Sequence, residues 1–581
     1  MDVALAVLRI RKIQAALKVL TILGLTAIHW PQQKILGAGR YSFIIVGGGT
    51  AGCVLANRLT ERYRFKVLLI EAGDDPPLES MFPGLVGYLP KTSLDWNYTE
   101  QYDKHRDDYQ NNIELPLTQG KMLGGSSSNN FMIYSRGHPH DYNSWAKIVG
   151  DQSWNYDNVL PYFKKSERLD DPEILYSKYA NFHGTSGYMH IMKEPHLETK
   201  PYLNMFKELR HKIRIDFNGD EYLGYGEPTF TISQGVRQST AFSFLRPVKY
   251  RHNLHVLKNT LVTRILFDDF KTAIGVEALT EDRKLIKIMA EEEVIVTAGA
   301  FNSAKLLMLS GIGRKIDLQS LGIQLVSDLP VGQNLKDHPA ALVAYKMKRS
   351  NDPPKPPNYA EFPMPCITGY IALNKTHTYP DSETICYILP SDSKTALSVC
   401  SFNLGLNYNT CQAIYLAGKG REVLFCLQAL LHPKSSGIVQ LASANSEEEP
   451  LVYLNAYSEE EDLEAMVNAC EELDKIRSTS YFNNVQGEAI NLRLPKCEGL
   501  LYGTKEYWRC HVLSTRMTLW HYTGACSMGR VVDSRLRVFG VRGLRVSDSC
   551  AIPHIPRAHI GAAVIMVAEK GADMIKADHG G

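Results

Sequence analysis

One stretch near the start of this chain, residues 41–71, limits what it can fold into more than any other feature. A short apolar run at 41–46 predicts a buried strand, and a G-x-G-x-x-G turn follows it at 47–52. Apolar residues at helical spacing come next, and a second apolar run at 67–70 ends on Glu71. This order of strand, glycine turn, helix, strand and acid is typical of a unit that binds an adenine dinucleotide.

The glycine turn would hold the phosphates of such a cofactor. Glycine permits the tight turn and lets the helix N-terminus approach a pyrophosphate, while Glu71 falls where a ribose hydroxyl would be bound. By itself the motif fits NAD and FAD equally well, so the rest of the chain has to separate the two. The cofactor-binding residues expected from this unit are Gly47, Gly49, Thr50, Ala51, Gly52 and Glu71.

Composition narrows the class of protein. A chain of 581 residues can bury a large core and is predicted to form two domains. Its 64 basic and 62 acidic residues leave a formal net charge of +2, so no basic excess points to a nucleic-acid partner. The eleven cysteines show no C-x-x-C or other metal-like spacing, so we expect no metal site and at most one or two disulfide bridges.

The first 40 residues differ from the rest of the chain. Basic side chains within 9–12 precede an apolar run at 19–28, which is the order found in a secretory signal peptide. The run is too short for a stable membrane span. Glycosylation sequons at Asn97 and Asn374 also favour a secreted protein. We therefore expect residues 1–40 to be a leader that directs secretion, and an amphipathic N-terminal helix is the alternative.

A second glycine-rich stretch, GKMLGGSSSNNFMIYSRG at 120–137, follows the dinucleotide unit. Its two adjacent glycines and three serines predict a turn that exposes backbone N–H groups and hydroxyls to a phosphate or to the polar edge of a ring. Read alone it fits an ordinary turn, but its place after a nucleotide-binding unit favours a binding role. The residues expected to bind are Gly124, Gly125, Ser126, Ser127 and Asn130.

Together with three further segments, these stretches resemble the glucose-methanol-choline (GMC) oxidoreductases, a flavoprotein family of alcohol oxidases and dehydrogenases. The resemblance covers about residues 40–577, and WNYDNVLPYFKKSE at 154–167 is most similar to insect members. The segments that match family motifs are the two signatures at 120–137 and 299–313, GQNLKDH at 332–338, and GLRVSDSCAIP at 543–553 beside the flavin ribityl chain.

The resemblance implies an α/β fold with an α+β substrate part. Residues 41–140, 240–335 and 535–577 would assemble a Rossmann-like FAD-binding domain from discontinuous segments. Residues 141–239 and 336–534 would form a substrate domain around an antiparallel sheet. Most of the last segment carries no chemistry that is readable from sequence.

The same resemblance implies FAD as the cofactor. Asn129 stands where some members carry a histidine that is joined covalently to the flavin, so we expect FAD to bind non-covalently. Val262 matches the family position whose backbone contacts adenine. The other residues implied at the flavin are Asp548, Ala551 and Ile560.

Two histidines near the C-terminus, His521 and His559, occupy the catalytic positions of the family. Prolines and a helical stretch from about residue 561 predict that His559 lies just before a helix, whose positive N-terminal end would stabilise an anionic reduced flavin. A neutral imidazole can accept a hydroxyl proton near neutral pH. We expect His521 to be the base and His559 to align the substrate, and we interpret the nearby His554 as structural.

The predicted function is an FAD-dependent alcohol oxidoreductase that transfers hydride from a CH–OH group to flavin N5. An ecdysteroid hydroxyl oxidised to a ketone and a sugar such as glucose are both open as substrates, and oxygen and a quinone are both open as electron acceptors. At 559–563 the chain reads HIGAA where insect relatives often show an N-T-N-A-P-like stretch, which weighs against glucose. Two other functions stay open, an NAD(P)-dependent dehydrogenase and a non-catalytic flavin or ligand binder.

Overall fold

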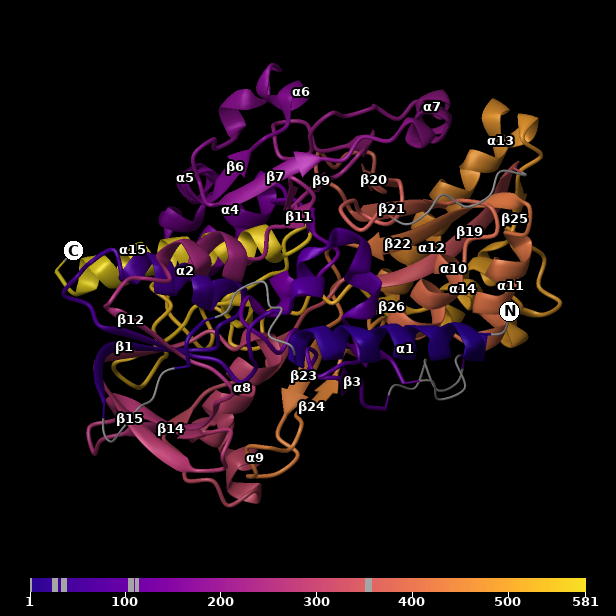
Figure 1. The fold of residues 1–581 in the computed structure, drawn as a ribbon. Coiled ribbons are helices and arrows are strands. Elements are labelled where there is room, and N and C mark those ends of the chain that lie inside the picture. Colours follow the sequence, from indigo (N-terminus) through magenta and orange to yellow (C-terminus); the bar gives the residue numbers. More distant parts are fainter. Residues whose placement is uncertain are drawn as a thin grey trace.

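Two large sheets, one mostly parallel and one antiparallel, organise the molecule, and helices pack on both (Figure 1). This is the α/β architecture expected from the sequence, so the predicted fold class is confirmed. The computed structural model describes residues 3–22, 30–32, 39–102, 109, 114–350 and 358–580.

The first sheet is built from segments that lie far apart in the sequence. Its strands are β1 (Arg40–Val46), β2 (Val67–Ile70), β12 (Leu254–Leu257), β13 (Leu261–Phe267), β14 (Ala273–Leu279), β15 (Leu285–Val296) and β27 (Leu544–Val546). They are ordered β12-β2-β1-β15-β14-β13, and β27 also pairs with β15. β12, β2, β1, the end of β15 and β27 run parallel, whereas β13 and β14 are antiparallel. The carboxyl ends of β1 and β2 therefore lie side by side, where the glycine turn and Glu71 begin.

Two helices far apart in the sequence lie together beside this sheet. β1 and β2 are buried on both faces over most of their length, as is typical of parallel strands covered by helices. Helix α2 (Thr50–Leu59) packs on these strands, and α15 (Gly561–Asp578) lies alongside α2 (Figure 1). A buried ion pair between Arg58 and Glu569, 2.7 Å long, joins the two helices. The C-terminal segment is thereby held against the dinucleotide unit.

The second sheet is antiparallel throughout. Its strands are β8 (Gly224–Gly226), β19 (Pro339–Arg349), β20 (Cys366–Ile371), β21 (Ser382–Leu389), β22 (Arg421–Leu430), β25 (Glu488–Ala489) and β26 (Met517–Thr518). They are ordered β25-β19-β22-β21-β20-β8, and β26 also pairs with β19. Helices α12 (Glu460–Asp474) and α14 (Lys505–Ser514) pack on one face. Alternate residues of β21 and β22 belong to a different core cluster and face the other way.

A smaller sheet contains strands from both of the predicted domains. Strands β5 (Ile133–Tyr134), β9 (Thr229–Phe230), β7 (Met189–Lys193) and β6 (Glu167–Leu169) pair in that order. Because β5 continues from the second glycine-rich stretch, this sheet crosses the boundary expected at residue 140. The division of the chain into an FAD-binding and a substrate domain at 140, 240, 335 and 535 stays a prediction.

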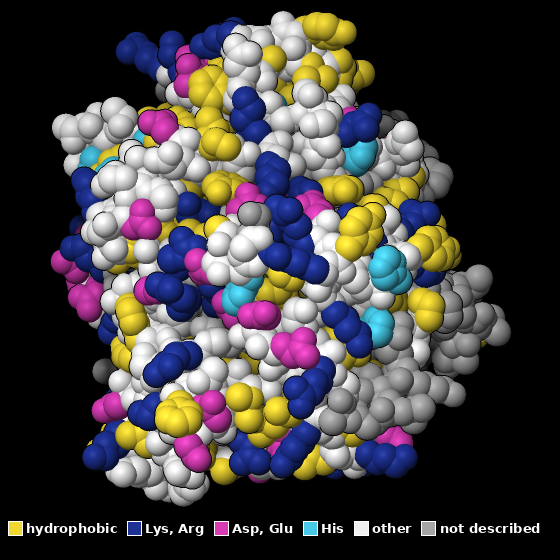
Figure 2. Space-filling model, turned by 90° about the vertical axis from the view of Figure 1, so that its left-hand side faces the viewer, with side chains coloured by type: hydrophobic (Ala, Val, Ile, Leu, Met, Phe, Trp, Pro, Cys, Tyr) yellow, Lys and Arg dark blue, Asp and Glu magenta, His cyan; other side chains and the backbone are white. Residues whose placement is uncertain are grey.

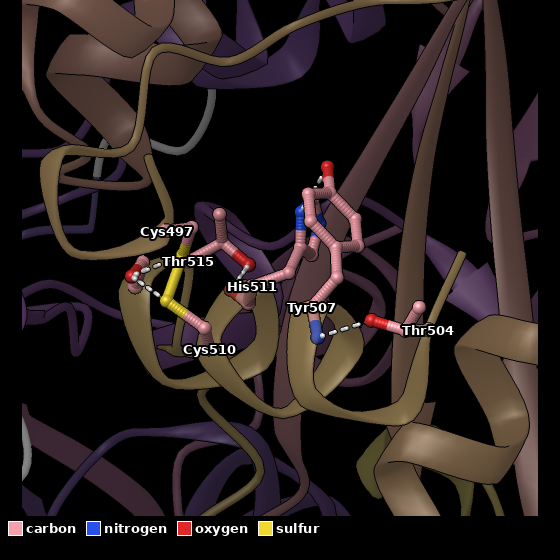
Figure 3. Close-up of a disulfide and its surroundings, with 7 residues drawn as sticks. Cys497, Thr504, Tyr507, Cys510, His511 and Thr515 are labelled. Carbon is pink, nitrogen blue, oxygen red and sulfur yellow. Dashed lines mark hydrogen bonds between the residues drawn. A yellow bond between two sulfur atoms is a disulfide. The ribbon is translucent and has the colours of Figure 1, made fainter. Parts of the chain in front are cut away.

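Four disulfide bridges correct the expectation of at most two. The spacing of cysteines along the chain did not predict these bridges, because the paired cysteines become neighbours only in the folded protein. Cys386 and Cys426, for example, face each other across β21 and β22. Figure 3 shows a second bridge, which ties the loop before α14 to that helix. The bridges are Cys386–Cys426, Cys400–Cys411, Cys497–Cys510 and Cys526–Cys550, and Cys53, Cys366 and Cys470 are free and buried.

Most of the expected leader that the structure describes is helix α1 (Val3–Ile22). Arg11 Nη1 donates a hydrogen bond to the carbonyl oxygen of Lys91 at 3.0 Å, and Gln14 Nε2 donates to Tyr88 O at 3.1 Å. This helix is therefore hydrogen-bonded to the loop around residues 88–91. The later part of the expected apolar run, 23–28, lies outside the described residues. None of the helices in the described part of the chain combines the length and apolarity needed to cross a membrane.

The surface carries charges of both signs. On the face shown in Figure 2, Lys and Arg side chains are interspersed with Asp and Glu, in keeping with the small net charge of the chain. Within the described ranges, no group of three or more His, Cys, Asp and Glu side chains is placed to hold a metal ion.

Candidate active site

One cavity brings most of the predicted cofactor-binding residues and both histidines together. Its lining draws on the dinucleotide unit and on strands β21 and β22, so it lies where the two large sheets approach each other. Gly52, Gly124 and Ala551 are not part of the lining. The predicted residues that line the cavity are Gly47, Gly49, Thr50, Ala51, Glu71, Gly125, Ser126, Ser127, Asn130, Val262, His521, Asp548, His559 and Ile560.

The glycine turn has the geometry that a tight strand-to-helix connection requires. Gly47 has a φ of +105°, and a Cβ there would lie 2.6 Å from the carbonyl oxygen of Thr297. A Cβ on Gly52 would lie 1.9 Å from the carbonyl oxygen of Gly47, so Gly52 shapes the turn without reaching the cavity. A Cβ on Gly49, by contrast, would meet its nearest heavy atom, Cα of Gly125, at 3.8 Å, which is an ordinary contact. Gly49 and the first two residues of α2, Thr50 and Ala51, line the cavity, so the start of this helix is placed to bind a phosphate.

Glu71 follows β2, and its carboxylate lies at the cavity. Oε2 accepts a hydrogen bond from the N–H of Gly48 at 2.8 Å, and Oε1 accepts one from the N–H of Gly73 at 2.8 Å. Burial raises the pKa of Glu71 to about 7. Hydroxyl donors from a ribose would stabilise the ionised form, which is the reason that an acid here suits a nucleotide.

The second glycine-rich turn lies directly against the first. The N–H of Gly124 donates to the carbonyl oxygen of Gly48 at 2.7 Å, so Gly124 supports the turn while Gly125 and Ser126 reach the cavity. Asn129 also lines the cavity, and its buried Nδ2 has no hydrogen-bond partner among the described residues. An unpartnered buried donor at a cavity wall is available to a ligand.

Asp548 anchors the C-terminal segment to the rest of the cavity. Its Oδ2 accepts hydrogen bonds from the N–H of Gly299 at 2.7 Å and from the hydroxyl of Ser303 at 2.6 Å. Burial raises the pKa of Asp548. Ala551 ends the short 3₁₀ helix Ser549–Ala551 and is fully buried, which keeps it away from the cavity surface.

The two histidines lie next to each other at the cavity. Their ring centroids are 4.8 Å apart, and the ring planes are inclined by 77°. His559 precedes Ile560 and the first residue of α15, Gly561, so the predicted start of this helix is confirmed. Ile560, Gly561 and Ala562 line the cavity, which places the positive N-terminal end of α15 beside it.

Glu383 of β21 is the partner of His559. Its fully buried Oε1 lies 3.1 Å from His559 Nε2 and also accepts a hydrogen bond from Thr368 Oγ1 at 2.9 Å. Burial by itself would raise the pKa of Glu383, but the charge and hydrogen bond of His559 outweigh it, and the pKa lies below its ordinary value. An ionised carboxylate here holds a proton on His559 Nε2.

His521 is held by the GQNLKDH segment. Its backbone N–H donates to Asp337 Oδ1 at 2.8 Å, and its Nδ1 lies 2.9 Å from Nδ1 of His338. Burial, and then the neighbouring His559 and His338, lower the pKa of His521 well below its ordinary value of 6.5. The imidazole therefore stays neutral and keeps a lone pair that can accept a proton.

Neither Glu383 nor His338 was assigned a role from the sequence. The available signal for Glu383 was an acidic residue inside the apolar strand SETICYIL, where a buried charge needs a partner. His338 was visible as part of a family motif, but its contact with His521 joins positions 183 apart. His554, interpreted as structural, does not line the cavity, and its Nδ1 lies 3.4 Å from His432 Nε2.

The sheet face that carries Glu383 is apolar at the cavity apart from that carboxylate and the hydroxyl of Tyr387. Alternate residues of a strand share a face, so Ile385 and Tyr387 point to the same side as Glu383, and Leu427 is the cross-strand partner of Ile385. All three of these side chains line the cavity. Further apolar side chains in the lining are Phe131, Val399, Leu404, Leu519 and Trp520.

The residues present fit FAD. The start of α2, where Gly49, Thr50 and Ala51 line the cavity, suits phosphate groups, and the carboxylate of Glu71 can accept hydrogen bonds from a ribose. The unpartnered Nδ2 of Asn129 suits a hydrogen-bond acceptor of the cofactor, and the start of α15 suits negative charge on a reduced flavin.

Comparison with known families agrees with this chemistry. A family model described as GMC oxidoreductase matches residues 41–340, and a second model with the same description matches residues 433–568. The two matches together span most of the chain and include the glycine turn and both histidines.

Individual relatives cover nearly the whole chain. It is 37% identical to an ecdysone oxidase of Bombyx mori over 94% of this chain and 83% of the relative. It is 32% identical to a glucose dehydrogenase [FAD, quinone] of Drosophila melanogaster over 92% of this chain and 87% of the relative. Among solved structures, a formate oxidase of Aspergillus oryzae matches with a TM-score of 0.80 and 26% identity, covering 94% of this chain and 99% of the other.

These matches decide between the functions that the sequence left open. Family models over most of the chain and relatives named as oxidases and FAD-dependent dehydrogenases support a flavin-dependent oxidoreductase over the NAD(P)-dependent and the non-catalytic alternatives. The chain belongs to the GMC oxidoreductase family and is an FAD-dependent oxidoreductase that acts on CH–OH donors.

Proposed function

We propose that the protein oxidises a ring hydroxyl of a bulky, largely apolar alcohol of the ecdysteroid class to a ketone. The observation that carries this proposal is the apolar face of β21 and β22, where Ile385, Tyr387 and Leu427 line the cavity beside Glu383. A sugar has hydroxyls around its whole ring, and each needs a polar partner when it leaves water. A steroid nucleus instead offers an apolar face to such a wall. The ecdysone oxidases among the relatives also support this substrate class.

His521 and His559 would both act on the hydroxyl group of the alcohol. In the proposed reaction His521 accepts the hydroxyl proton while the hydride on the same carbon leaves to bound FAD, which supplies the two-electron chemistry. His559, with the Nε2 proton held by Glu383, would hydrogen-bond the alcohol oxygen and fix its angle. The residues proposed to hold FAD are the predicted ones that line the cavity: Gly47, Gly49, Thr50, Ala51, Glu71, Gly125, Ser126, Ser127, Asn130, Val262, Asp548 and Ile560.

Anaerobic reduction of bound FAD distinguishes the two substrate classes. We expect an ecdysteroid to bleach the flavin at concentrations at least ten times lower than glucose does, because the apolar wall favours it by roughly 1–3 kcal/mol. Ile385→Asn, which adds a polar group to the wall, should narrow that difference. Reduction by glucose at equal or lower concentrations would instead favour the sugar dehydrogenase alternative.

The electron acceptor that completes the cycle is proposed to be oxygen or a quinone. Relatives carry names of both kinds, ecdysone oxidase and glucose dehydrogenase [FAD, quinone]. The reduced enzyme can be mixed with air-saturated buffer and, separately, with a benzoquinone under argon. The acceptor is the one that restores the flavin absorbance faster.

FAD is expected to bind without a covalent bond, because Asn129 cannot form one with the flavin. Acid precipitation should leave the yellow colour in the supernatant, and flavin that stays with the pellet would contradict this. Glu71→Ala should weaken FAD binding by roughly 1.5–3 kcal/mol, the range for a buried charge-assisted hydrogen bond. Glu71→Gln keeps an acceptor oxygen, so its affinity for FAD should lie between those of the wild type and Glu71→Ala. Unchanged FAD affinity in Glu71→Ala, measured by titration of the apoprotein, would show that Glu71 does not bind the cofactor.

We further propose that the protein is secreted and loses its leader. The four disulfides support this, because such bridges persist in oxidising compartments. The sequon residues Asn97 and Asn374 are also exposed. Expression in a eukaryotic host should give protein in the medium with an N-terminus trimmed near residue 30. An intracellular product that keeps Met1 would reject the proposal and favour a retained α1.

A further inference from the structure

His338 is a buried histidine beside the site that the proposed reaction does not use. It ends the GQNLKDH segment, directly before β19, and its side chain is fully buried. Its Nε2 lies 3.0 Å from the carbonyl oxygen of Leu431, and its Nδ1 lies 2.9 Å from Nδ1 of His521. The two imidazole rings are almost perpendicular, at 89°. His338 is thus placed between a backbone carbonyl and the expected base.

These two contacts determine where each proton lies. A carbonyl oxygen can only accept, so Nε2 of His338 must carry a hydrogen that it donates to Leu431. Burial lowers the pKa of His338 to about 3, so the ring is neutral and its Nδ1 has a lone pair. The hydrogen in the 2.9 Å contact therefore belongs to Nδ1 of His521, which donates it to His338.

This arrangement leaves the lone pair of His521 on Nε2. We propose that His338 is a positioning residue that locks His521 in the Nδ1–H tautomer, so that Nε2 is the atom that accepts the alcohol proton. The proposal rests on the proposed role of His521 as the base. When Nε2 takes the proton, the Nδ1–H bond to His338 stays in place and supports the cation that forms.

The rest of the motif supports the same geometry. Asp337, the neighbour of His338, accepts the backbone N–H of His521 at 2.8 Å. His521 is therefore held at its backbone nitrogen and at one ring nitrogen by two consecutive residues. Both the position and the tautomer of the base come from one short segment.

The tautomer can be read directly in the unaltered enzyme. Holoenzyme grown with ring nitrogen-15 histidine is observed by NMR in the oxidised state, and the signals missing from His521→Ala are those of His521. We expect its Nδ1 to be protonated and its Nε2 to be unprotonated. The opposite tautomer, or a mixture of both, would overturn the proposal without any variant of His338.

Variants at 338 test the effect on rate. His338→Leu removes the acceptor and should slow anaerobic flavin reduction by up to about 10⁴-fold, the scale seen when the histidine base of a catalytic triad is left in the wrong tautomer. His338→Asn should recover most of the rate, because its Oδ1 can occupy the position of Nδ1 and accept the hydrogen bond. FAD absorbance confirms that each variant holds its cofactor.

His511 provides a matched control. It is also a buried histidine, and its Nε2 lies 2.7 Å from the carbonyl oxygen of Leu342, but it packs beside Tyr507 on α14, away from the cavity lining (Figure 3). His511→Leu should therefore leave the reduction rate unchanged.

The outcomes separate this proposal from the proposed function. If His338→Leu reduces its flavin at the wild-type rate, or if Asn is as slow as Leu, the positioning role is wrong. If His521→Ala is itself as fast as wild type, the base assignment is the part that fails. Should His338→Leu not fold, the tautomer in the unaltered enzyme and the rate of His338→Asn decide.

Discussion

Flavin reduction by the alcohol should slow by about 10²–10⁴-fold in His521→Ala, the usual range for the loss of a positioned general base. The neutral imidazole at 521 lines the cavity and is held at its backbone nitrogen and at Nδ1, so its removal takes away the proton acceptor without disturbing the glycine turns. Anaerobic stopped-flow measurement of FAD absorbance isolates this step from reoxidation. The flavin content of the variant should equal that of the wild type, because other segments hold the cofactor.

Two results would contradict this assignment. One is a wild-type rate of reduction in His521→Ala with FAD fully bound. The other concerns pH: burial lowers the pKa of His521, so the base stays unprotonated at pH values where an ordinary histidine becomes charged. The reduction rate should therefore stay level as the pH falls through 6.5, the ordinary value. A rate that falls about tenfold for each pH unit below that point would mean that the base is not this buried imidazole.

Loss of the His559 side chain should lower both rate and stability. Glu383 is fully buried and ionised beside His559, and His559→Ala leaves that carboxylate without its main partner. We expect the unfolding free energy to fall by about 3 kcal/mol, the lower end for breaking a buried pair, because His559 keeps some solvent exposure. Flavin reduction should slow as well, because the alcohol oxygen loses the group that fixes its angle.

The matched variants are His559→Asn and the double variant Glu383→Gln/His559→Ala. Asn keeps a donor for Glu383 and should be milder than Ala in both measurements. Gln removes the buried charge, so the double variant should regain most of the lost stability but not the rate. Thermal unfolding with FAD bound, together with stopped-flow reduction, provides both readouts. If His559→Asn and His559→Ala show the same stability and the same reduction rate, His559 does not align the substrate. The assignment of His521 as the base would be unaffected.

The cofactor unit could be predicted from the sequence because its physics is local. The turn after β1 needs glycine at 47 and 52, since a Cβ at 52 would overlap the carbonyl oxygen of Gly47 and a Cβ at 47 would overlap that of Thr297, just after β15. The start of α15 at Gly561 could be predicted for the same reason, because prolines and apolar spacing act over a single turn of chain. These local patterns predicted an adenine-dinucleotide site, whereas FAD, the fold class and the roles of the two histidines were implied by the resemblance to the GMC family.

What surrounds the histidines was decided by the tertiary structure. Glu383 meets His559 across 176 positions and His338 meets His521 across 183, so no local pattern could pair them. The four disulfides were underestimated for the same reason, since spacing along the chain does not show which cysteines face each other across two strands. The sequence alone determined which groups could carry out the chemistry. Only the packing of two distant sheets determined the partners of those groups, because burial and proton positions depend on contacts that the folded chain creates.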